Sequence, residues 1–181
     1  MFGTMYHWHK RGFFGTDLSR QDSEYVTDLV ATIEREGGII VPVFLYEHSG
    51  QTISAAPFSC PWDSGKVGFW AATGAQIKAE FDGDKDKARA CIISEIKTMD
   101  HYLRGNVYGF TIEDGDEQVD SCWGFIGDYD DEHGCLAEAR SNADYHVKAE
   151  QTARLRRLRT MIEKRVPLHV REAELGGCHV A

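Results

Sequence analysis

The sequence predicts an α+β protein with a small antiparallel or mixed sheet of three to five strands, helices mainly on one face and a basic C-terminal helix. Three observations support this class. Residues 84–103 carry apolar side chains at helical spacing, residues 106–126 contain two strand-like runs around an Asp-Gly turn, and the connections between segments are short. The order of elements is too irregular for a Rossmann fold, and neither GxGxxG nor GxxxxGK[ST] occurs.

The first part of the chain predicts a strand followed by a helix. Residues 1–15 suit a short strand and a loop. Residues 7–11 (His-Trp-His-Lys-Arg) could be a ligand pair or a phosphate-binding patch, but their alternation is more typical of an edge strand with one wet face. Ser19 or Asp22 can cap the helix that the apolar spacing of residues 21–36 predicts, and two glycines follow it.

The middle of the chain predicts two strands around a long loop, then two helices. Residues 39–46 are continuously apolar and β-branched, although Pro42 favours an edge position or a bulge. Residues 66–72 predict the second strand, and residues 75–81 a short helix. Residues 84–103 form the clearest helix of the chain, since one apolar stripe runs along it.

The last part predicts a hairpin and then helix. Residues 106–113 and 118–126 are the hairpin strands. From residue 130 onward the apolar spacing indicates helix, which continues as a basic amphipathic stretch and ends at Pro167. We expect the tail after residue 169 to be loosely held.

Composition indicates a globular protein. The 181 residues, 42% of them hydrophobic, suit an α+β core domain over residues 1–128 and a C-terminal helical extension over residues 129–181 that packs on the same domain. No apolar run reaches the ~20 residues that cross a bilayer and no signal peptide is evident, so we expect a cytoplasmic protein without membrane contact. An odd number of cysteines without a secretion signal indicates reduced thiols. They are Cys60, Cys91, Cys122, Cys135 and Cys178.

The loop of residues 46–68 concentrates residues that could perform chemistry. Cys60 could act as a nucleophile, with His48 as its base and Asp63 orienting the imidazole. A reactive thiol needs an electropositive setting, which the sequence does not indicate here. The alternative is a Cys packed in a tight turn whose polar side chains satisfy backbone amides, and the sequence favours this structural interpretation.

Residues 119–127 repeat part of this loop in a second Asp-Ser-Cys-Trp-Gly run, which adds Cys122 to the candidates. We expect Trp62 and Trp123 to be structural, with their N–H groups fixing the two loops to each other. Zinc could be held by His48, Cys60 and Cys122, or by the pair His133 and Cys135. No close CxxC or HxxxH pair occurs, so buried thiols are the favoured interpretation and we predict no metal and no cofactor.

Charge is strongly segregated within a net charge of −9. Residues 105–139 contain ten acids and no Lys or Arg, which predicts a docking face for a basic partner, with a solvated hairpin as the alternative. The candidate partner-binding residues are Glu113, Asp114, Asp116, Glu117, Asp128, Asp130, Asp131 and Glu132.

Residues 145–171 reverse the balance, with eight Lys or Arg against two Glu. Arg154, Arg156, Arg157 and Arg159 could contact nucleic acid or an acidic partner, or pair with the acidic face of the same protein in a homodimer. Because the apolar residues between these arginines need burial, an ordinary docked helix is the favoured interpretation.

Four segments resemble a group of small proteins carried by phages, plasmids and other mobile elements. They are residues 46–50 (YEHSG), 57–68 (PFSCPWDSGKVG), 102–109 (YLRGNVYG) and 120–125 (DSCWGF). The resemblance covers roughly residues 8–128. It implies a setting in a mobile element and assigns no catalytic residues.

The sequence therefore favours a non-enzymatic accessory protein. Its expected role is to bind and inhibit or redirect a host defence or nucleic-acid-processing complex through the acidic surface, in the manner of counter-defence, anti-CRISPR or anti-restriction proteins. The expected partner is a host protein or ribonucleoprotein complex in the cytoplasm of the bacterial host. One alternative is a small Cys/His enzyme or metal-binding protein acting on a nucleotide or signalling molecule. Another is a nucleic-acid binder that uses the basic C-terminal helix.

Overall fold

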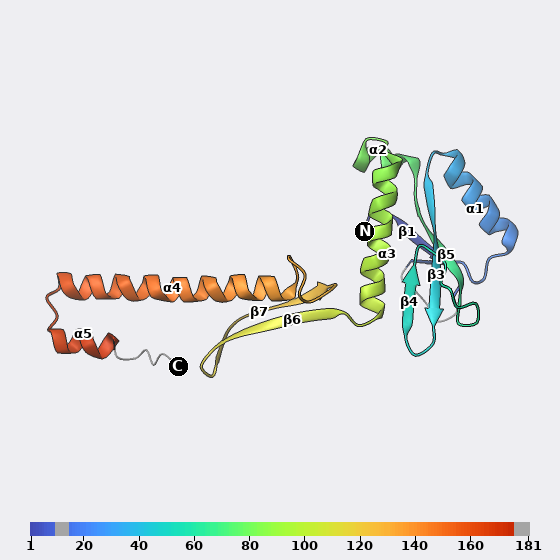
Figure 1. The fold of residues 1–181 in the computed structure, drawn as a ribbon. Helices are drawn as coiled ribbons and strands as arrows, with labels where there is room; N and C mark the ends of the chain where they lie inside the picture. The colour runs from blue at the N-terminus through green and yellow to red at the C-terminus, as the bar shows by residue number, and fades with distance from the viewer. Residues whose placement is uncertain (10–14, 176–181) are drawn as a thin grey trace. The chain divides into compact units, whose positions relative to one another are not determined.

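The computed structural model describes residues 1–9 and 15–175, with side chains described up to residue 171. The chain forms two compact units (Figure 1). The first contains Met1–Tyr108 and Phe125–Asp128, and the second contains Gly109–Gly124 and the described part of Tyr129–Ala181. Lys10, Arg11 and Cys178 lie outside the described residues. The predicted α+β class is confirmed.

The first unit is built on a five-stranded mixed sheet in the order β2-β1-β5-β3-β4. β1 and β2 are parallel, and all other neighbours are antiparallel. The strands are β1 (Thr4–His7), β2 (Thr16–Asp17), β3 (Ile39–Glu47), β4 (Gln51–Ser54) and β5 (Ser64–Ala72). The helices of this unit are α1 (Ser23–Arg35), α2 (Gly74–Phe81) and α3 (Lys85–Leu103). All three helices and strands β3 and β5 match their predicted segments.

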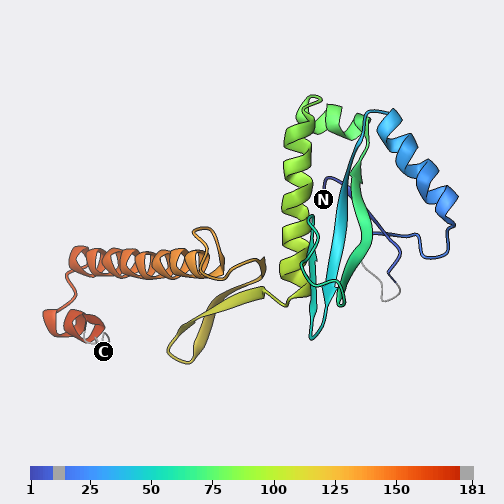
Figure 2. The ribbon, with the colours of Figure 1, turned by 45° about the vertical axis from the view of Figure 1, so that its right-hand side comes forward.

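Strand β5 is the centre of the sheet and is covered on both faces (Figure 2). Phe69 and Ala71 pack on the α1 side, whereas Val67, Trp70 and Ala72 belong to the larger core on the α3 side. Successive side chains of a strand point to opposite faces, so a strand between two helical layers needs the continuous apolar run found here.

Helix α1 seals one face of the sheet. The side chain of Asp22 caps it by accepting from the backbone N–H of Tyr25 at 2.8 Å, as the sequence predicts. Ile33 is its fully buried residue and packs with Phe69. The opposite face is covered by α2 and α3, whose N-terminal backbone N–H groups donate to the capping side chains of Thr73 and Asp84.

Helix α3 places a continuous apolar stripe against the sheet. Its buried residues are Ala88, Ile92, Ile96 and Met99. They belong to one cluster with Val41, Val43 and Trp70 of the sheet, and Ile92 and Trp70 are fully inaccessible to solvent. This cluster is the main hydrophobic core of the protein.

Pro42 lies within β3 at a place where β3 has a neighbour on one side only. Its register partner is Phe69 of β5, while β4 pairs with β3 from Phe44 onward. A bulge follows between Val43 and Phe44. The missing N–H of proline is tolerated at an edge or next to a bulge, so the prediction made for Pro42 is confirmed.

The second unit contains most of the predicted hairpin, residues 109–124, and two helices. The hairpin strands are β6 (Val107–Asp114) and β7 (Glu117–Ile126), and the helices are α4 (Cys135–Glu163) and α5 (Leu168–Leu175). Gly115 has φ +62° at the first central position of the turn, which suits a type II′ hairpin turn. Of the described side chains in this unit, Cys135 alone is fully buried.

Three expectations differ from the structure. Strand β1 lies inside the sheet between β2 and β5, and His7 is 2% exposed, so the predicted edge strand with one wet face is wrong. The loop of residues 46–68 contains an unpredicted strand, β4, which pairs with β3. An unpredicted helix, α5, begins directly after Pro167, because proline also suits the start of a helix, while the expectation of a loosely held tail stays a prediction.

The register of β1 against β5 is testable at Gly68. A Cβ added there would lie 2.1 Å from the backbone oxygen of Tyr6, whereas one added at Gly65 of the same strand meets nothing within 4 Å. We expect Gly68→Ala to lower the free energy of unfolding by about 1–3 kcal/mol in urea denaturation. Gly65→Ala should change it by less than about 0.5 kcal/mol. Equal stability of the two variants would contradict the register.

Candidate functional site

The sheet brings the two ends of the loop of residues 46–68 together. Tyr46 on β3 pairs with Thr52 of β4 on one side and with Ser64 of β5 on the other. The turn after β3 and the segment before β5 therefore leave the same end of the sheet. The backbone N–H of Glu47 also donates to the carbonyl of Asp63 at 2.8 Å.

Three of the predicted catalytic candidates meet at this end, and we call His48, Cys60 and Asp63 the loop cluster. His48 Nδ1 lies 3.6 Å from Asp63 Oδ2. The thiol of Cys60 donates to the same carboxylate oxygen at 3.7 Å. The hydroxyl of Ser64 donates to the carbonyl of Cys60 and closes the turn.

The geometry of the loop cluster suits a hydrogen-bonded turn better than an activated nucleophile. A catalytic thiol is ionised by a neighbouring cation or base. Here the hydrogen-bond partner of the thiol is the carboxylate of Asp63, which is acceptor-only and negatively charged. The His48 side chain is 68% exposed and stacks on the ring of Tyr46, with 6.5 Å between the ring centroids.

The remaining Cys and His candidates lie in the second unit. Cys122 is exposed on β7, His133 is exposed before α4, and Cys135 is buried as the first residue of α4. Cys60, Cys91, Cys122 and Cys135 are all free thiols. In the part of the chain that the structure describes, no group of three or more His, Cys, Asp or Glu is arranged to hold a metal ion.

A polar cavity of about 310 Å³ lies beside the loop cluster. It is lined by Tyr46, His48, Ser49, Gly50, Gln51, Thr52, Leu103 and Arg104. Arg104 Nη1 lies 3.6 Å from the carboxylate of Asp100, which also accepts from the backbone N–H of Ile53 at 2.9 Å. The sequence analysis missed Arg104 as a site residue, because only the fold brings the end of α3 beside the β3–β4 turn.

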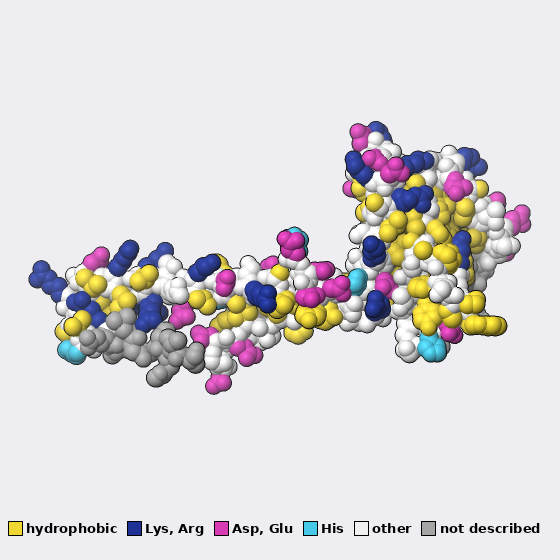
Figure 3. All heavy atoms as spheres, viewed as in Figure 1, with side chains coloured by type: hydrophobic (Ala, Val, Ile, Leu, Met, Phe, Trp, Pro, Cys, Tyr) yellow, Lys and Arg dark blue, Asp and Glu magenta, His cyan; other side chains and the backbone are white. Residues whose placement is uncertain are grey.

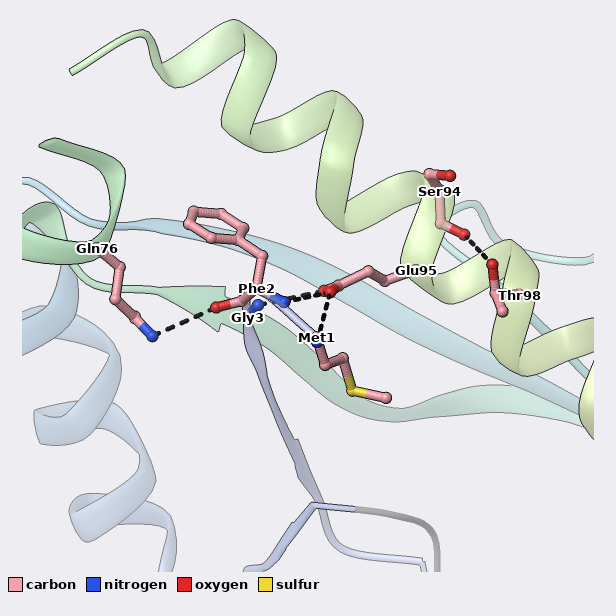
Figure 4. Close-up of polar contacts among 7 residues, drawn as sticks. All are labelled: Met1, Phe2, Gly3, Gln76, Ser94, Glu95 and Thr98. Carbon is pink, nitrogen blue, oxygen red and sulfur yellow. Dashed lines mark hydrogen bonds and ion pairs between the residues drawn. The ribbon is translucent and has the colours of Figure 1, made fainter. Parts of the chain in front are cut away.

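A larger apolar groove of about 450 Å³ lies along α3. Its lining includes Cys91, Thr98, Met99 and Tyr102. Glu95, also in the lining, holds the N-terminal segment by accepting from the backbone N–H groups of Phe2 and Gly3 (Figure 4). Burial raises the pKa of the Cys91 thiol, and the Glu95 carboxylate raises it further.

The hairpin of the second unit presents an aromatic side chain to solvent. Trp123 is 71% exposed and its indole lies over Gly109, where an added Cβ would come within 2.2 Å of the ring. Glu117, Val119 and Ser121 alternate with Trp123 along β7 and are also exposed, so they share one face of the strand. We call these four residues the hairpin face.

The side chains of Trp62 and Trp123 are exposed within their own units. Trp62 is 91% exposed in the first unit, and Trp123 is the exposed residue of the hairpin face. A tryptophan that fixes two loops to each other would bury its ring and pair its N–H. The predicted role, in which the N–H groups of Trp62 and Trp123 fix the two loops to each other, would join the two units and stays a prediction.

All eight acids predicted to bind a partner are exposed. Within the second unit they form two groups at opposite ends of β7, which at 10 residues is about 30 Å long. The tip acids are Glu113, Asp114, Asp116 and Glu117, and the base acids are Asp130, Asp131 and Glu132. Asp128 is exposed in the first unit.

Helix α4 carries the predicted basic residues. Arg156, Arg157 and Arg159 are exposed, and Arg154 is half-buried. The hairpin contacts the N-terminal half of this helix, where His146 Nε2 lies 3.2 Å from Asp120 Oδ2. The four arginines follow this contact in the C-terminal half of the helix.

Comparison with known proteins gives no relative for this arrangement. No family model, no curated protein and no solved structure matches the chain. Among the described residues, no helix has the length and apolar character required to span a bilayer.

Thiol reactivity tests the assignment of the loop cluster. Among the four cysteines of the described residues, we expect iodoacetamide at pH 8 to modify Cys122 first and Cys135 last, because Cys122 is exposed and Cys135 is buried. Cys91 should react more slowly than Cys122, since it is partly buried and a raised pKa leaves less thiolate at a given pH. Peptide mass spectrometry over time gives each rate.

The same measurement separates a structural Cys60 from an activated one. If the loop cluster is a hydrogen-bonded turn, His48→Ala should change the rate of Cys60 by less than about threefold. A fall of more than about tenfold in a folded His48→Ala protein would mean that the imidazole activates the thiol.

Proposed function

We propose that the protein is a non-enzymatic accessory protein of a phage or other mobile element that binds a host complex through its hairpin. The partner is a host defence or nucleic-acid-processing complex with a basic surface, met in the cytoplasm of the bacterial host. The observation that carries this proposal is the hairpin face, where exposed Trp123 shares one face of β7 with Glu117, one of the tip acids.

The hairpin carries a side chain suited to supplying binding energy, Trp123, and acidic side chains that attract a basic partner. Exposed tryptophan is rare on a surface without a partner, and it is the residue type most enriched where binding energy concentrates. Trp123 lies flat on Gly109, so little ring freedom remains to be lost on binding. The tip acids attract a basic surface over a distance and favour one orientation of encounter.

The biological setting is supported by the resemblance of four segments to proteins of mobile elements. Small proteins of this kind often act by binding, so the setting agrees with a surface that carries an anchor residue. The inhibition of a defence or processing complex, whether a protein or a ribonucleoprotein, is the activity we propose for this binding.

A second candidate function is supported by the loop cluster and the polar cavity beside it. His48, Arg104 and the hydroxyls of Ser49 and Thr52 line one cavity of about 310 Å³, a size suited to a small polar ligand such as a nucleotide. This candidate is the weaker one, because the thiol of Cys60 donates to a carboxylate. Loss of the biological effect in folded Cys60→Ala or His48→Ala proteins would favour it.

Affinity capture from a bacterial host lysate tests the proposal. The tagged wild-type protein, treated with nuclease, should retain one stoichiometric protein complex. Two variants should lose it: Trp123→Ala, and a quadruple variant with the tip acids changed to Lys. Each should raise the dissociation constant of the purified pair by at least about thirtyfold, which corresponds to a loss of ~2 kcal/mol of binding free energy.

A matched control shows whether the effect depends on where the charges are changed or only on the change of net charge. Changing Asp28, Glu34, Glu36 and Glu80 to Lys produces the same change of net charge on exposed residues of the first unit. This control should bind like the wild type. Equal binding by the control and both hairpin variants would contradict the proposal, and a complex that disappears with nuclease would favour a nucleic-acid binder.

A further inference from the structure

The middle and C-terminal half of α4 carry an apolar stripe that nothing in the described part of the second unit covers fully. Val147, Leu155 and Ile162 are 52%, 59% and 57% exposed. With half-buried Leu158, they fall within a sector of about 80° at 3.6 residues per turn. A groove of about 330 Å³ lies on this stripe, lined by Gln151, Arg154, Leu155 and Leu158.

A helix with an exposed apolar stripe is stabilised when another helix or a sheet packs on that stripe. Helical stability in proteins comes mostly from packing of an apolar face, and a two-stranded hairpin has little stability of its own. The hairpin contacts α4 at His146, and between residues 147 and 163 only Arg154, Leu158 and Met161 are even half-buried. In Figure 3, hydrophobic side chains reach the surface between Lys and Arg side chains at this end of α4.

The charge pattern along α4 indicates what covers the stripe. Residues 130–147 contain five acids and one Arg, a net charge of −4, whereas residues 148–165 contain seven Lys or Arg and two Glu, a net charge of +5. The sign changes between Asp144 and Lys148, next to Val147. A second copy of the same segment in the opposite direction would therefore place each basic half against an acidic half.

We propose that two copies of the protein pair through antiparallel α4 helices, with a two-fold axis at Val147. Leu155 and Ile162 of each copy then lie against the N-terminal half of the partner's α4 and the loop before it. Along the pair, residues 148–165 of each copy, with a net charge of +5, come level with residues 130–147 of the other, with a net charge of −4. The interface is isologous, so both copies contribute the same residues twice.

The parallel arrangement is disfavoured by the same charges. It would place the seven Lys and Arg of residues 148–165 beside their own copies, and like charges across an interface act against association. Neither the hairpin face nor the tip acids are used in the antiparallel pair. This inference is therefore independent of the proposed host partner, and each can fail without the other.

Sedimentation velocity of the purified full chain tests the pairing. Over a roughly hundredfold range of concentration we expect a species of twice the 20.4 kDa chain mass. Leu155→Glu combined with Ile162→Glu should weaken dimerisation by at least about 100-fold, because the interface would bury charge. Both side chains are exposed in one copy, so circular dichroism should report a folded protein.

Tyr145 supplies the matched control. It is a large apolar residue of the same helix, 69% exposed, and lies about 120° away from the centre of the stripe. Tyr145→Ser should remain dimeric. A wild-type chain that stays monomeric at every concentration would overturn the proposal, and so would dimerisation unaffected by the Leu155 and Ile162 changes.

A photo-crosslinking amino acid at position 162 tests the orientation. In the antiparallel pair it should link to residues near 132 of the other copy, identified by mass spectrometry of the joined peptides. Links to residues near position 162 of the other copy would show a parallel pair and overturn the proposed arrangement.

Discussion

The burial of strand β5 on both faces is the constraint on which the first unit depends. Phe69 and Ala71 need one helical layer and Trp70 needs another, so α1 and α3 must cover opposite faces of the same sheet. Gly68 belongs to the same constraint, because only the absence of a Cβ lets β1 approach β5 closely enough to pair. The loop cluster follows from this arrangement, since the loops that carry His48 and Asp63 leave β3 and β5 at the same end of the sheet.

The second unit has the opposite character. Its hairpin and α4 bury Cys135 alone among the described side chains, while Trp123, Leu155 and Ile162 remain exposed. Exposed apolar surface of this kind is suited to packing against other molecules. The two proposals assign its surfaces to different partners: the hairpin face to a host complex and the apolar stripe of α4 to a second copy. Antiparallel pairing would also present two hairpins, so a dimer would engage a repeated or symmetric partner with higher avidity.

Much of the fold could be predicted because its determinants are local. Capping by Asp22, the stripe from Ala88 to Met99 and the turn at Gly115 are each contained in a few consecutive residues. Strand β4 could not be found this way, since four mostly polar residues become a strand only by pairing with β3.

The candidate site was less predictable, because its contacts join distant segments. The sequence placed His48, Cys60 and Asp63 in one loop but gave no sign of Arg104 or of Glu95 beside Phe2. The exposed position of Trp123 had a usable signal: a glycine inside a strand, such as Gly109, often marks an aromatic ring packed across the pair.

The measurement that tests the central claim most directly is hydrogen exchange of the protein with and without its purified host partner. The account predicts slower exchange on binding in residues 109–124 and no change in residues 46–68, whereas protection confined to residues 46–68 would contradict it.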